Sequence, residues 1–336
     1  MEVRGPVIVV VGASVGGVTA IQGLASALPA DFDAAVFVVL HIGAHKSELP
    51  WLLNQHSALP AHCPVDREPI EAGRIYVAPP DHHMMIEPGI IRLNRGPREN
   101  WARPAIDPLF RSAAAAYGPG VIGVILTGGL NDGTAGLHAV KQHGGATVVQ
   151  DPAGAADPSM PRSALRHVVV DHCVTLAELP ATLGMLVDAR TNHLAASAAR
   201  QPGDRMTADY KLDRPLAITC PDCGGALRPN AIGTLQQFSC HIGHVYSAEV
   251  LVAAQFAALE WSLEAALRAI GERAELCRQR AGAARDNADP ATAAAWDAAN
   301  DEAIERTAVL HRLLGQEWMH PGETETPADA ATPRGP

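Results

Sequence analysis

Short β-branched runs alternate with segments of helical period from residue 7 to about residue 188, and this alternation constrains the fold most. The clearest strands are expected at 7–11, 35–40, 74–78, 121–126 and 146–150, and helices at 16–28, 47–56, 107–117, 134–143 and 176–187. Such a pattern is typical of a parallel sheet covered by helices on both faces. We therefore predict a doubly wound, mainly parallel α/β domain over residues 1–188. A hairpin at one sheet edge is expected around Glu87-Pro88-Gly89.

Beyond residue 188 the alternation stops and three further segments follow. Residues 189–215 are rich in alanine, arginine, aspartate and proline and are expected to form a linker, followed by a cysteine-containing module at 216–246. Helical patterns at 247–280 and 291–314 predict a helical hairpin over 247–316, and the tail 317–336 is expected to be disordered. One apolar stripe should be buried within the hairpin, although it could also contact a second copy or another partner: Leu251, Phe256, Leu259, Trp261, Leu263 and Leu267.

Charge and cysteine usage limit the partners and the compartment. The formal net charge of -10 opposes attraction to nucleic acid and to anionic membranes, and favours a protein or small-molecule partner. The 6 cysteines are too few and too unevenly spaced for a disulfide framework. The apolar stretch 7–11 is too short for a signal sequence, and no run approaches about eighteen apolar residues. We expect a cytoplasmic protein without direct membrane insertion.

The turn after the first strand carries the first candidate catalytic residue. The sequence GASVGG at 12–17 places Ser14 between glycines where a strand gives way to a helix, as in a nucleophile elbow. A phosphate-binding loop and a serine that only caps the helix are the alternatives. Val18-Thr19 stands where a Walker loop needs a lysine and a hydroxyl residue. His41 stands at the second strand tip, where a dinucleotide fold needs an acidic residue.

Two further strand ends supply a base and a carboxylate. His41 follows the strand at 35–40, and Asp132 lies in the glycine-rich loop after the strand at 121–126. Each alone has a simpler explanation, as a structural histidine or a helix cap. Because open α/β sheets bind ligands beyond the carboxyl ends of their strands, the three side chains can converge. The pattern then predicts acyl transfer, with Ser14 as nucleophile, His41 as base and Asp132 orienting the imidazole.

Backbone donors for an oxyanion are expected beside the serine. The helix that follows Ser14 offers N–H groups near Val15 and Gly16, and Gly129 is a further oxyanion or substrate contact. The chain order of serine, histidine and aspartate differs from that of α/β-hydrolases, and the serine follows the first strand. An ordinary lipase or esterase is therefore disfavoured.

Five ordered motifs together resemble one known family. They are GASVGG at 12–17, LH at 40–41, IYVAPPDHHM at 75–84, RPAIDPLF at 103–110, and ILTG through NDGTAG at 125–136. Over roughly residues 7–188 the chain resembles the catalytic domain of bacterial chemotaxis protein-glutamate methylesterases, the CheB family. The resemblance implies hydrolysis of glutamate methyl esters on receptor helices, with release of methanol and a related glutamine deamidation, and no cofactor for catalysis. Ser14, His41 and Asp132 fall on the family's triad positions.

Some positions depart from the family pattern. Val15 stands where threonine or alanine is usual, Ile42-Gly43 where Met-Pro or a similar pair follows the histidine, Gly129-Leu130 where Met-Gly is usual, and Ala105 where serine is common. The chain also enters the catalytic motif almost at once, so we expect a receiver-less form. The intact triad favours an active methylesterase on methylated chemoreceptor-like helices. The substitutions beside it motivate an alternative, a catalytically weak signalling adaptor.

The module at 216–246 has the spacing of a zinc site. Cys220 and Cys223 form a C-x₂-C knuckle, sixteen residues separate it from Cys240, and His244 completes a C-x₃-H pair. Two thiolates on a tight turn with a distant Cys/His pair are typical of a closed tetrahedral structural zinc site. His241 is an alternative fourth ligand, and a ribbon that has lost its metal is the alternative for the whole module. The segment resembles the zinc-ribbon tail of some receiver-less CheB-like proteins.

Overall fold

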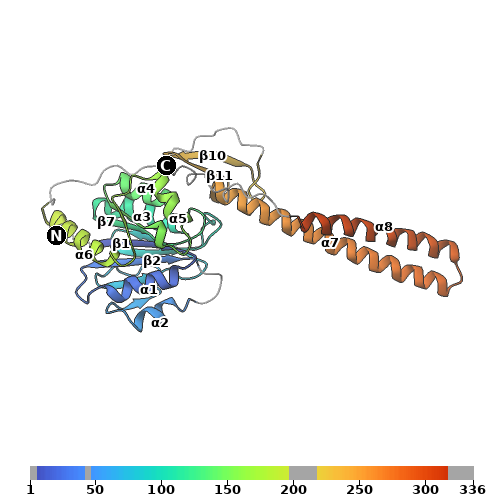
Figure 1. The fold of residues 1–336 in the computed structure, drawn as a ribbon, viewed down its shortest axis with the longest axis horizontal. Coiled ribbons are helices and arrows are strands. Elements are labelled where there is room, and N and C mark those ends of the chain that lie inside the picture. Colours follow the sequence, from blue (N-terminus) through green and yellow to red (C-terminus); the bar gives the residue numbers. More distant parts are fainter. Residues whose placement is uncertain (1–5, 42–46, 197–217, 317–336) are drawn as a thin grey trace, which may run out of the picture. The chain divides into compact units, whose positions relative to one another are not determined.

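The computed structural model describes residues 6–41, 47–196 and 218–316 (Figure 1). The chain forms two compact units, which divide between Leu251 and Val252. Most of the linker expected at 189–215, and the tail expected to be disordered at 317–336, lie outside the described residues.

The first unit is built on a 7-stranded sheet in which every neighbouring pair of strands is parallel. The order across the sheet is β3-β4-β2-β1-β7-β8-β9. Its strands are β1 (Val7–Ala13), β2 (Ala34–Leu40), β3 (Ala61–His62), β4 (Arg74–Val77), β7 (Val121–Ile125), β8 (Ala146–Gln150) and β9 (His172–Val174). The predicted doubly wound parallel sheet is confirmed.

Successive residues of each central strand are buried on opposite faces of the sheet. Val9 and Val11 of β1 pack on the side of α1 (Gly17–Ala27), α2 (Leu49–Asn54) and α6 (Leu179–Ala196). Ile8 and Val10 pack on the side of α3 (Ile106–Tyr117), α4 (Thr134–Gln142) and α5 (Ser159–His167) (Figure 1). Because both faces are covered, the strands read as continuous apolar runs rather than as alternating ones.

The hairpin expected around residue 88 forms, but in a different place. Strands β5 (His83–Glu87) and β6 (Ile90–Asn94) pair only with each other in a separate antiparallel sheet, so its expected position at an edge of the main sheet is wrong. Met84 and Ile91 join the core on the α3 side, and the Ile86 N–H donates to Ser112 Oγ of α3. Packing against a helix therefore outweighs edge pairing here.

The cysteine-containing module folds as part of the first unit. Its antiparallel strands β10 (Leu227–Ile232), β11 (Leu235–Cys240) and β12 (Val245–Ser247) pair in that order. The Asn100 N–H donates to Val245 O at 2.7 Å, and His167 Nδ1 lies 2.7 Å from Thr234 Oγ1. These bonds join the small sheet to the α/β domain.

The second unit contains two long helices, most of α7 (Ala248–Asp286) and all of α8 (Pro290–Leu314). Asp289 caps α8 by accepting from the Thr292 N–H, and Arg285 pairs with Asp297. Small side chains are buried between the helices: Cys277, Ala281, Ala284, Ala293 and Ala303. The expected burial of the apolar stripe is wrong for Leu259 and Trp261, which are 38% and 68% exposed. Because α7 has 39 residues and α8 has 25, the first turns of α7 extend beyond α8.

Helix α7 is also long and apolar enough, by length and composition alone, to cross a membrane. One such helix is weak evidence for a span, since core helices of other proteins pass the same test. Glu260 and Glu264 interrupt the apolar residues of its first half.

Candidate active site and metal centre

The three predicted catalytic residues lie at the point where the strand order reverses. The chain runs from β1 toward β2 on one side of the sheet, and from β7 toward β8 on the other, although β1 and β7 are neighbours. The loops after β1 and β7 therefore diverge and leave a crevice at the carboxyl ends of the two strands. Ser14 follows β1, and Asp132 lies in the loop after β7.

Hydrogen bonds and close packing fix the turn that carries Ser14. Its N–H donates to Thr127 O at 3.0 Å, and Thr127 Oγ1 donates to Val15 O at 2.9 Å. Gly128 packs against the serine: a Cβ there would lie 2.8 Å from Ser14 Cβ and 2.2 Å from Met160 Sδ. Gly16 has φ +75°, a backbone conformation that suits glycine. The β1 tip is thus held by residues that follow β7.

His41 lies beside Ser14 because of the strand register. Ala13 is paired with Leu40 across β1 and β2, and the His41 N–H donates to Ala13 O at 3.2 Å. Nε2 of His41 lies 2.8 Å from Oδ2 of Asp132, which leaves Nδ1 for a second partner. No bond between described residues joins Ser14 Oγ to His41; such catalytic bonds commonly tighten only when substrate is bound.

Asp132 is buried and accepts hydrogen bonds on both carboxylate oxygens. Oδ2 accepts from His41 and from the Ile106 N–H at 2.6 Å, while Oδ1 accepts from Asn100 Nδ2 at 2.8 Å and the Gly133 N–H at 2.9 Å. Burial pushes the pKa of Asp132 upward, but the hydrogen bond and charge of His41, with the Ile106 and Asn100 donors, hold it below its usual range. An ionised Asp132 accepts the proton of Nε2, so Nδ1 of His41 is the basic nitrogen.

Asp107 is a second buried carboxyl next to Asp132. Its Oδ2 accepts from Asn100 Nδ2 at 2.9 Å, and its Oδ1 accepts from the Gly136 N–H at 2.6 Å. Burial and the charge of Asp132 raise the pKa of Asp107 to about 7. When two buried carboxyls lie this close, the state with one charged and one neutral carboxyl is favoured. Asp132 accepts more hydrogen bonds than Asp107, so Asp132 is the charged one.

The predicted oxyanion donors lie at the same edge of the sheet. Within the described residues, the N–H groups of Val15, Gly16 and Gly129 donate to no backbone acceptor outside the helices and strands. Val15 and Gly16 precede α1, where the N-terminal end of a helix favours negative charge. Gly129 differs, because a Cβ there would lie 3.1 Å from Asp157 Oδ2. A carboxylate beside Gly129 weakens it as a donor to an oxyanion.

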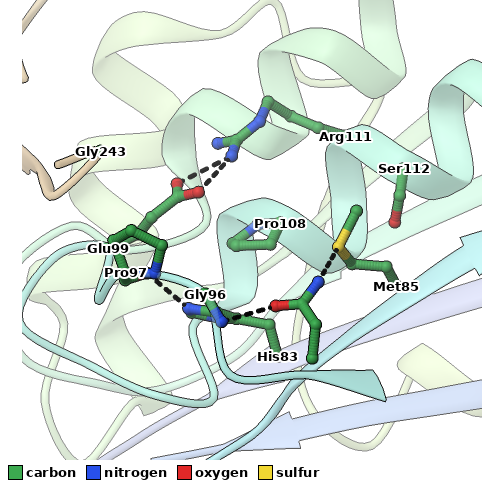
Figure 2. A pocket seen from close by; sticks show the side chains of 10 residues that line it. His83, Met85, Gly96, Pro97, Glu99, Pro108, Arg111, Ser112 and Gly243 are labelled. Carbon is green, nitrogen blue, oxygen red and sulfur yellow. Dashed lines mark hydrogen bonds and ion pairs between the residues drawn. The ribbon is translucent and has the colours of Figure 1, made fainter. Parts of the chain in front are cut away.

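A cavity of about 420 Å³ is lined by none of the triad residues (Figure 2). Glu99 accepts two hydrogen bonds from Arg111 Nη2 at 2.7 and 2.8 Å at one side of this cavity. His83 and Gly243, from the hairpin and the cysteine-containing module, also line it. The cavity therefore lies where the module meets the α/β domain, rather than over Ser14.

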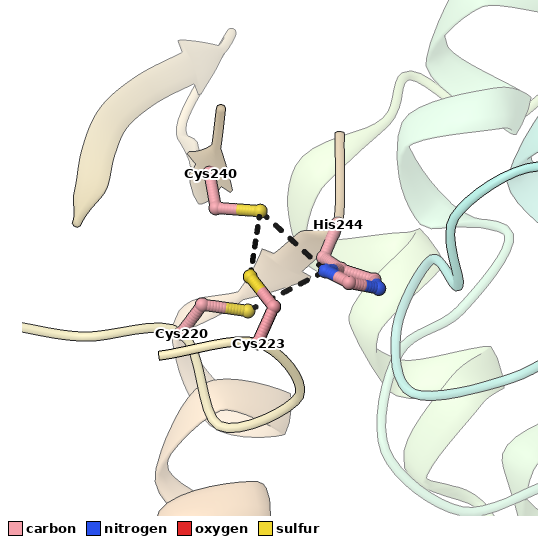
Figure 3. A group of neighbouring side chains, drawn as sticks. All are labelled: Cys220, Cys223, Cys240 and His244. Carbon is pink, nitrogen blue, oxygen red and sulfur yellow. Dashed lines mark hydrogen bonds between the residues drawn. The ribbon is translucent and has the colours of Figure 1, made fainter. Parts of the chain in front are cut away.

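The four predicted metal ligands converge (Figure 3). Sγ of Cys223 and Cys240 are 3.6 Å apart, and Nδ1 of His244 lies 3.6 Å from Cys220 Sγ and 3.5 Å from Cys240 Sγ. A tetrahedron with Zn–S of about 2.3 Å and Zn–N of about 2.0 Å has edges of about 3.5–3.8 Å. The donor set and its spacing thus fit zinc. His241 is not in this cluster.

Sequence reasoning did not find several residues that support the triad. Asn100 joins both buried carboxyls and has φ +49°, yet it lies in a loop without periodic pattern. Its Oδ1 accepts from the Ser247 N–H at 3.1 Å, a contact that spans 147 residues. Thr127, which lies in the motif ILTG, holds the Ser14 turn through its carbonyl and its hydroxyl. No local sequence pattern marks Asn100, because its role depends on contacts with residues that are distant in the sequence.

Comparison with known proteins identifies relatives of the α/β domain. The CheB methylesterase family matches residues 9–183. A protein of Leptospira interrogans with the name protein-glutamate methylesterase/protein-glutamine glutaminase is 38% identical over 174 residues, 51% of this chain and 90% of that protein. An Anaeromyxobacter dehalogenans protein of the same name is 38% identical over 177 residues, which cover 52% of each chain.

A solved structure shows the same fold. The CheB methylesterase catalytic domain of Thermotoga maritima superposes with a TM-score of 0.53 at 31% sequence identity. The match covers 55% of this chain and 100% of that one. The cysteine-containing module and the helix pair follow the region that the family match covers.

Proposed function

Because the chain belongs to the CheB methylesterase family, we propose that it is a serine hydrolase acting on glutamate methyl esters of chemoreceptor-like proteins, with a related glutamine deamidase activity. The observation that carries the proposal is the 2.8 Å bond between His41 and the buried Asp132, at the strand end paired with that of Ser14. The names of the relatives supply the substrate class, glutamate and glutamine side chains of proteins.

The chain's own residues account for both half-reactions. Nδ1 of His41 takes the proton of the Ser14 hydroxyl while Oγ attacks the ester carbonyl carbon, and Asp132 stabilises the imidazolium. The tetrahedral intermediate collapses by breaking the bond to the methoxy oxygen, which leaves as methanol with the proton from His41. Water then attacks the acyl-serine with His41 again as base, which regenerates Ser14 and releases the glutamate side chain. With a glutamine substrate the leaving group is ammonia.

We assign the oxyanion to the N–H groups of Val15 and Gly16. Both groups are without backbone partners among the described loops and stand at the N-terminal end of α1. Preorganised donors of this kind stabilise the developing charge without reorganisation. Gly129, beside Asp157, is assigned to substrate contact instead.

A protein substrate fits the exposed surface beside the triad. Val15, Trp101 and Leu130 are 59%, 44% and 44% exposed, and they are close in sequence to Ser14, Asn100 and Asp132. Exposed apolar side chains at a site are typical of contacts with another protein. We therefore assign the substrate to receptor helices rather than to a free small ester, and the compartment to the cytoplasm.

Methanol release from methylated receptor, or from a surrogate ester, tests the proposal. Ser14→Ala should lower kcat by at least about 10³-fold, because the nucleophile is lost. Ser26→Ala is the matched control, since the Ser26 hydroxyl donates to Gly23 O on the exposed side of α1. Equal rates of methanol release for wild type and Ser14→Ala would refute the proposed serine hydrolase activity. An inactive wild type that still binds receptor helices would instead favour the adaptor.

We further propose that Cys220, Cys223, Cys240 and His244 hold a structural Zn²⁺. Bound zinc would tie the knuckle before β10 to the turn between β11 and β12. Asp222 Oδ2 accepts from Tyr246 OH at 2.6 Å and lies 4.0 Å from His244 Nε2. A carboxylate beside the distal nitrogen is the usual support for a histidine ligand. No catalytic step is assigned to the metal.

A further inference from the structure

Residues 245–249, the clamp segment, join the end of the cysteine-containing module to the start of α7. We infer that the clamp segment is a positioning element of the hydrolase site, which holds Asn100 and Asn131 and through Asn100 holds Asp132. The inference rests on the proposed function. It concerns a feature outside the family match, since residues 245–249 follow the matched region 9–183.

Asn100 is held from the clamp side on two of its groups. Its backbone N–H donates to Val245 O at 2.7 Å, and its Oδ1 accepts from the Ser247 N–H at 3.1 Å. Its Nδ2 then faces the carboxyls and donates to Asp132 Oδ1 at 2.8 Å and to Asp107 Oδ2 at 2.9 Å. The Ser247 N–H can bond only to an oxygen, so it fixes which end of the amide points at Asp132.

Asn131, which precedes Asp132, is held by the clamp segment in the same way. Its Oδ1 accepts from Ser247 Oγ at 2.6 Å, and its Nδ2 donates to Glu249 Oε2 at 2.7 Å. Ser247 Oγ also accepts from the Val250 N–H at 3.3 Å and so caps α7. One serine therefore sets the start of a helix and the loop that carries the triad carboxylate.

The network is buried, which makes each bond consequential. Asn100, Asn131 and Ser247 are 7%, 4% and 1% exposed. A buried polar group that loses its partner keeps its full desolvation cost, so such networks hold one arrangement. The side chains that face Asp132 are His41, Asn100 and Asp107, with His83 and Arg111 interacting with its charge at longer range. Displacing the clamp segment would thus loosen the carboxylate that orients His41.

Four variants of the full chain test this role. Ser247→Ala removes the bond to Asn131, and Ser247→Thr retains a hydroxyl. Asn100→Gly removes the side chain without penalty for the positive φ. Asp289→Ala is the control, because it removes the N-cap of α8 in the other unit. The measurements are kcat and KM on a small surrogate ester, the thermal midpoint, and the pKa of Asp132 from ¹³C NMR titration of the carboxyl carbons.

The positioning role predicts a specific set of results. Ser247→Ala should lower kcat roughly tenfold with KM within about twofold, because it releases Asn131, the residue before Asp132, while the Ser247 N–H still donates to Asn100 Oδ1. Asn100→Gly should lower kcat further, because it removes the amide that donates to Asp132 itself. The pKa of Asp132 should rise in both variants. Ser247→Thr should recover most of the wild-type kcat, and Asp289→Ala should leave kcat and the pKa unchanged.

Different outcomes separate this inference from the proposed function. If both Ser247→Ala and Asn100→Gly kept the wild-type kcat and an unchanged pKa of Asp132, the positioning role of the clamp segment would be overturned, even if their thermal midpoints fell. A wild type that hydrolyses no ester would overturn the proposed function. The NMR titration would then still decide whether the clamp segment acts on Asp132.

Discussion

Asp107 and Asp132 share the amide of Asn100 but differ in their other partners. Asp132 also accepts from His41 and from backbone donors, whereas Asp107 accepts one further bond, from the Gly136 N–H. The pKa of Asp132 is therefore held low and that of Asp107 is raised to about 7. The pair places a neutral acid next to the charged carboxylate of the triad.

The raised pKa of Asp107 predicts how stability depends on pH. The unfolded chain releases this proton near 3.8, whereas the folded chain keeps it to about 7, so the folded state binds more protons in between. The contribution of Asp107 to the free energy of unfolding is thus complete below pH 3.8 and is lost as the pH rises through about 7. Urea unfolding across this window should show a smaller fall in unfolding free energy for Asp107→Asn than for wild type.

The control for Asp107→Asn is Asp66→Asn. Asp66 accepts from the Leu93 N–H, and this bond, with Arg92, lowers the pKa of its carboxyl despite partial desolvation. The contribution of Asp66 to the free energy of unfolding is present above its ordinary pKa of 3.8 and is lost only at lower pH. The two variants should therefore differ from wild type in separate pH windows. If the unfolding free energies of Asp107→Asn and wild type changed equally with pH between 3.8 and 7, the prediction that buried Asp107 is neutral would be wrong.

Replacing Asp132 by asparagine should impair catalysis far more than binding. An amide at position 132 would point two N–H groups into a site that already holds five donors, and it would not stabilise an imidazolium. We expect kcat to fall by about 10⁴-fold with little change in KM, as for loss of a triad carboxylate in general. Steady-state kinetics beside Asp151→Asn, an aspartate that caps a turn after β8, would check this. A fall of less than about tenfold would exclude Asp132 from the triad.

Which residues could be predicted from sequence follows from how each is placed. Ser14, His41 and Asp132 each follow a recognisable strand, and parallel strands bring their carboxyl ends to one edge, so convergence of the tips was predictable. The structure brings His41 and Asp132 into contact. Asn100 and Ser247 were not predictable, because a bond across 147 residues depends on how two loops pack.

Among the elements, the loop after β7 is the one most tightly packed against the nucleophile. Gly128→Ala would place a Cβ 2.2 Å from Met160 Sδ and 2.8 Å from Ser14 Cβ, so both must move. We expect a loss of about 2 kcal/mol in unfolding free energy and at least a tenfold loss of kcat. Urea unfolding and ester kinetics measure both.

Gly23→Ala is the matched control for the loop variant. Its Cβ would meet only Leu176 Cδ2, at 3.8 Å, and alanine is favoured over glycine inside α1 by up to about 1 kcal/mol. It should keep full activity and unfold at slightly higher urea. If Gly128→Ala behaved in the same way, the loop would not be what positions Ser14.

Elements differed in how well their sequences predicted them. Strands of five or more apolar residues, such as β1 and β2, carry enough pattern to be recognised, whereas the edge strands β3 and β9 have two and three residues. Helix α6 continues to Ala196, into the segment expected as linker, because alanine and leucine there favour a helix. Short strands and helix ends depend on neighbours that no local window contains.

At the scale of the whole chain, the cysteine-containing module of the first unit leads directly into α7, which continues into the second unit. Strand β12 ends at Ser247 and α7 begins at the next residue, so the clamp segment is covalently continuous with both the Cys/His cluster and the helix pair. Disorder of the Cys/His cluster should therefore also displace Val245, which directly follows His244 and accepts the hydrogen bond of the Asn100 N–H. Metal content, stability and activity are expected to change together.

Cys220→Ser tests this coupling. Serine is a poor zinc ligand, so the variant should lose about one zinc per chain by elemental analysis. The thermal midpoint should fall by about 5 °C or more, because binding energy at a structural site is folding energy. Ester hydrolysis should fall with it, since the clamp segment follows the fourth ligand. Cys173→Ser, an exposed cysteine outside the cluster, should keep metal, midpoint and activity. Unchanged metal content in Cys220→Ser would reject the ligand set, whereas loss of zinc with full activity would separate the metal from the clamp.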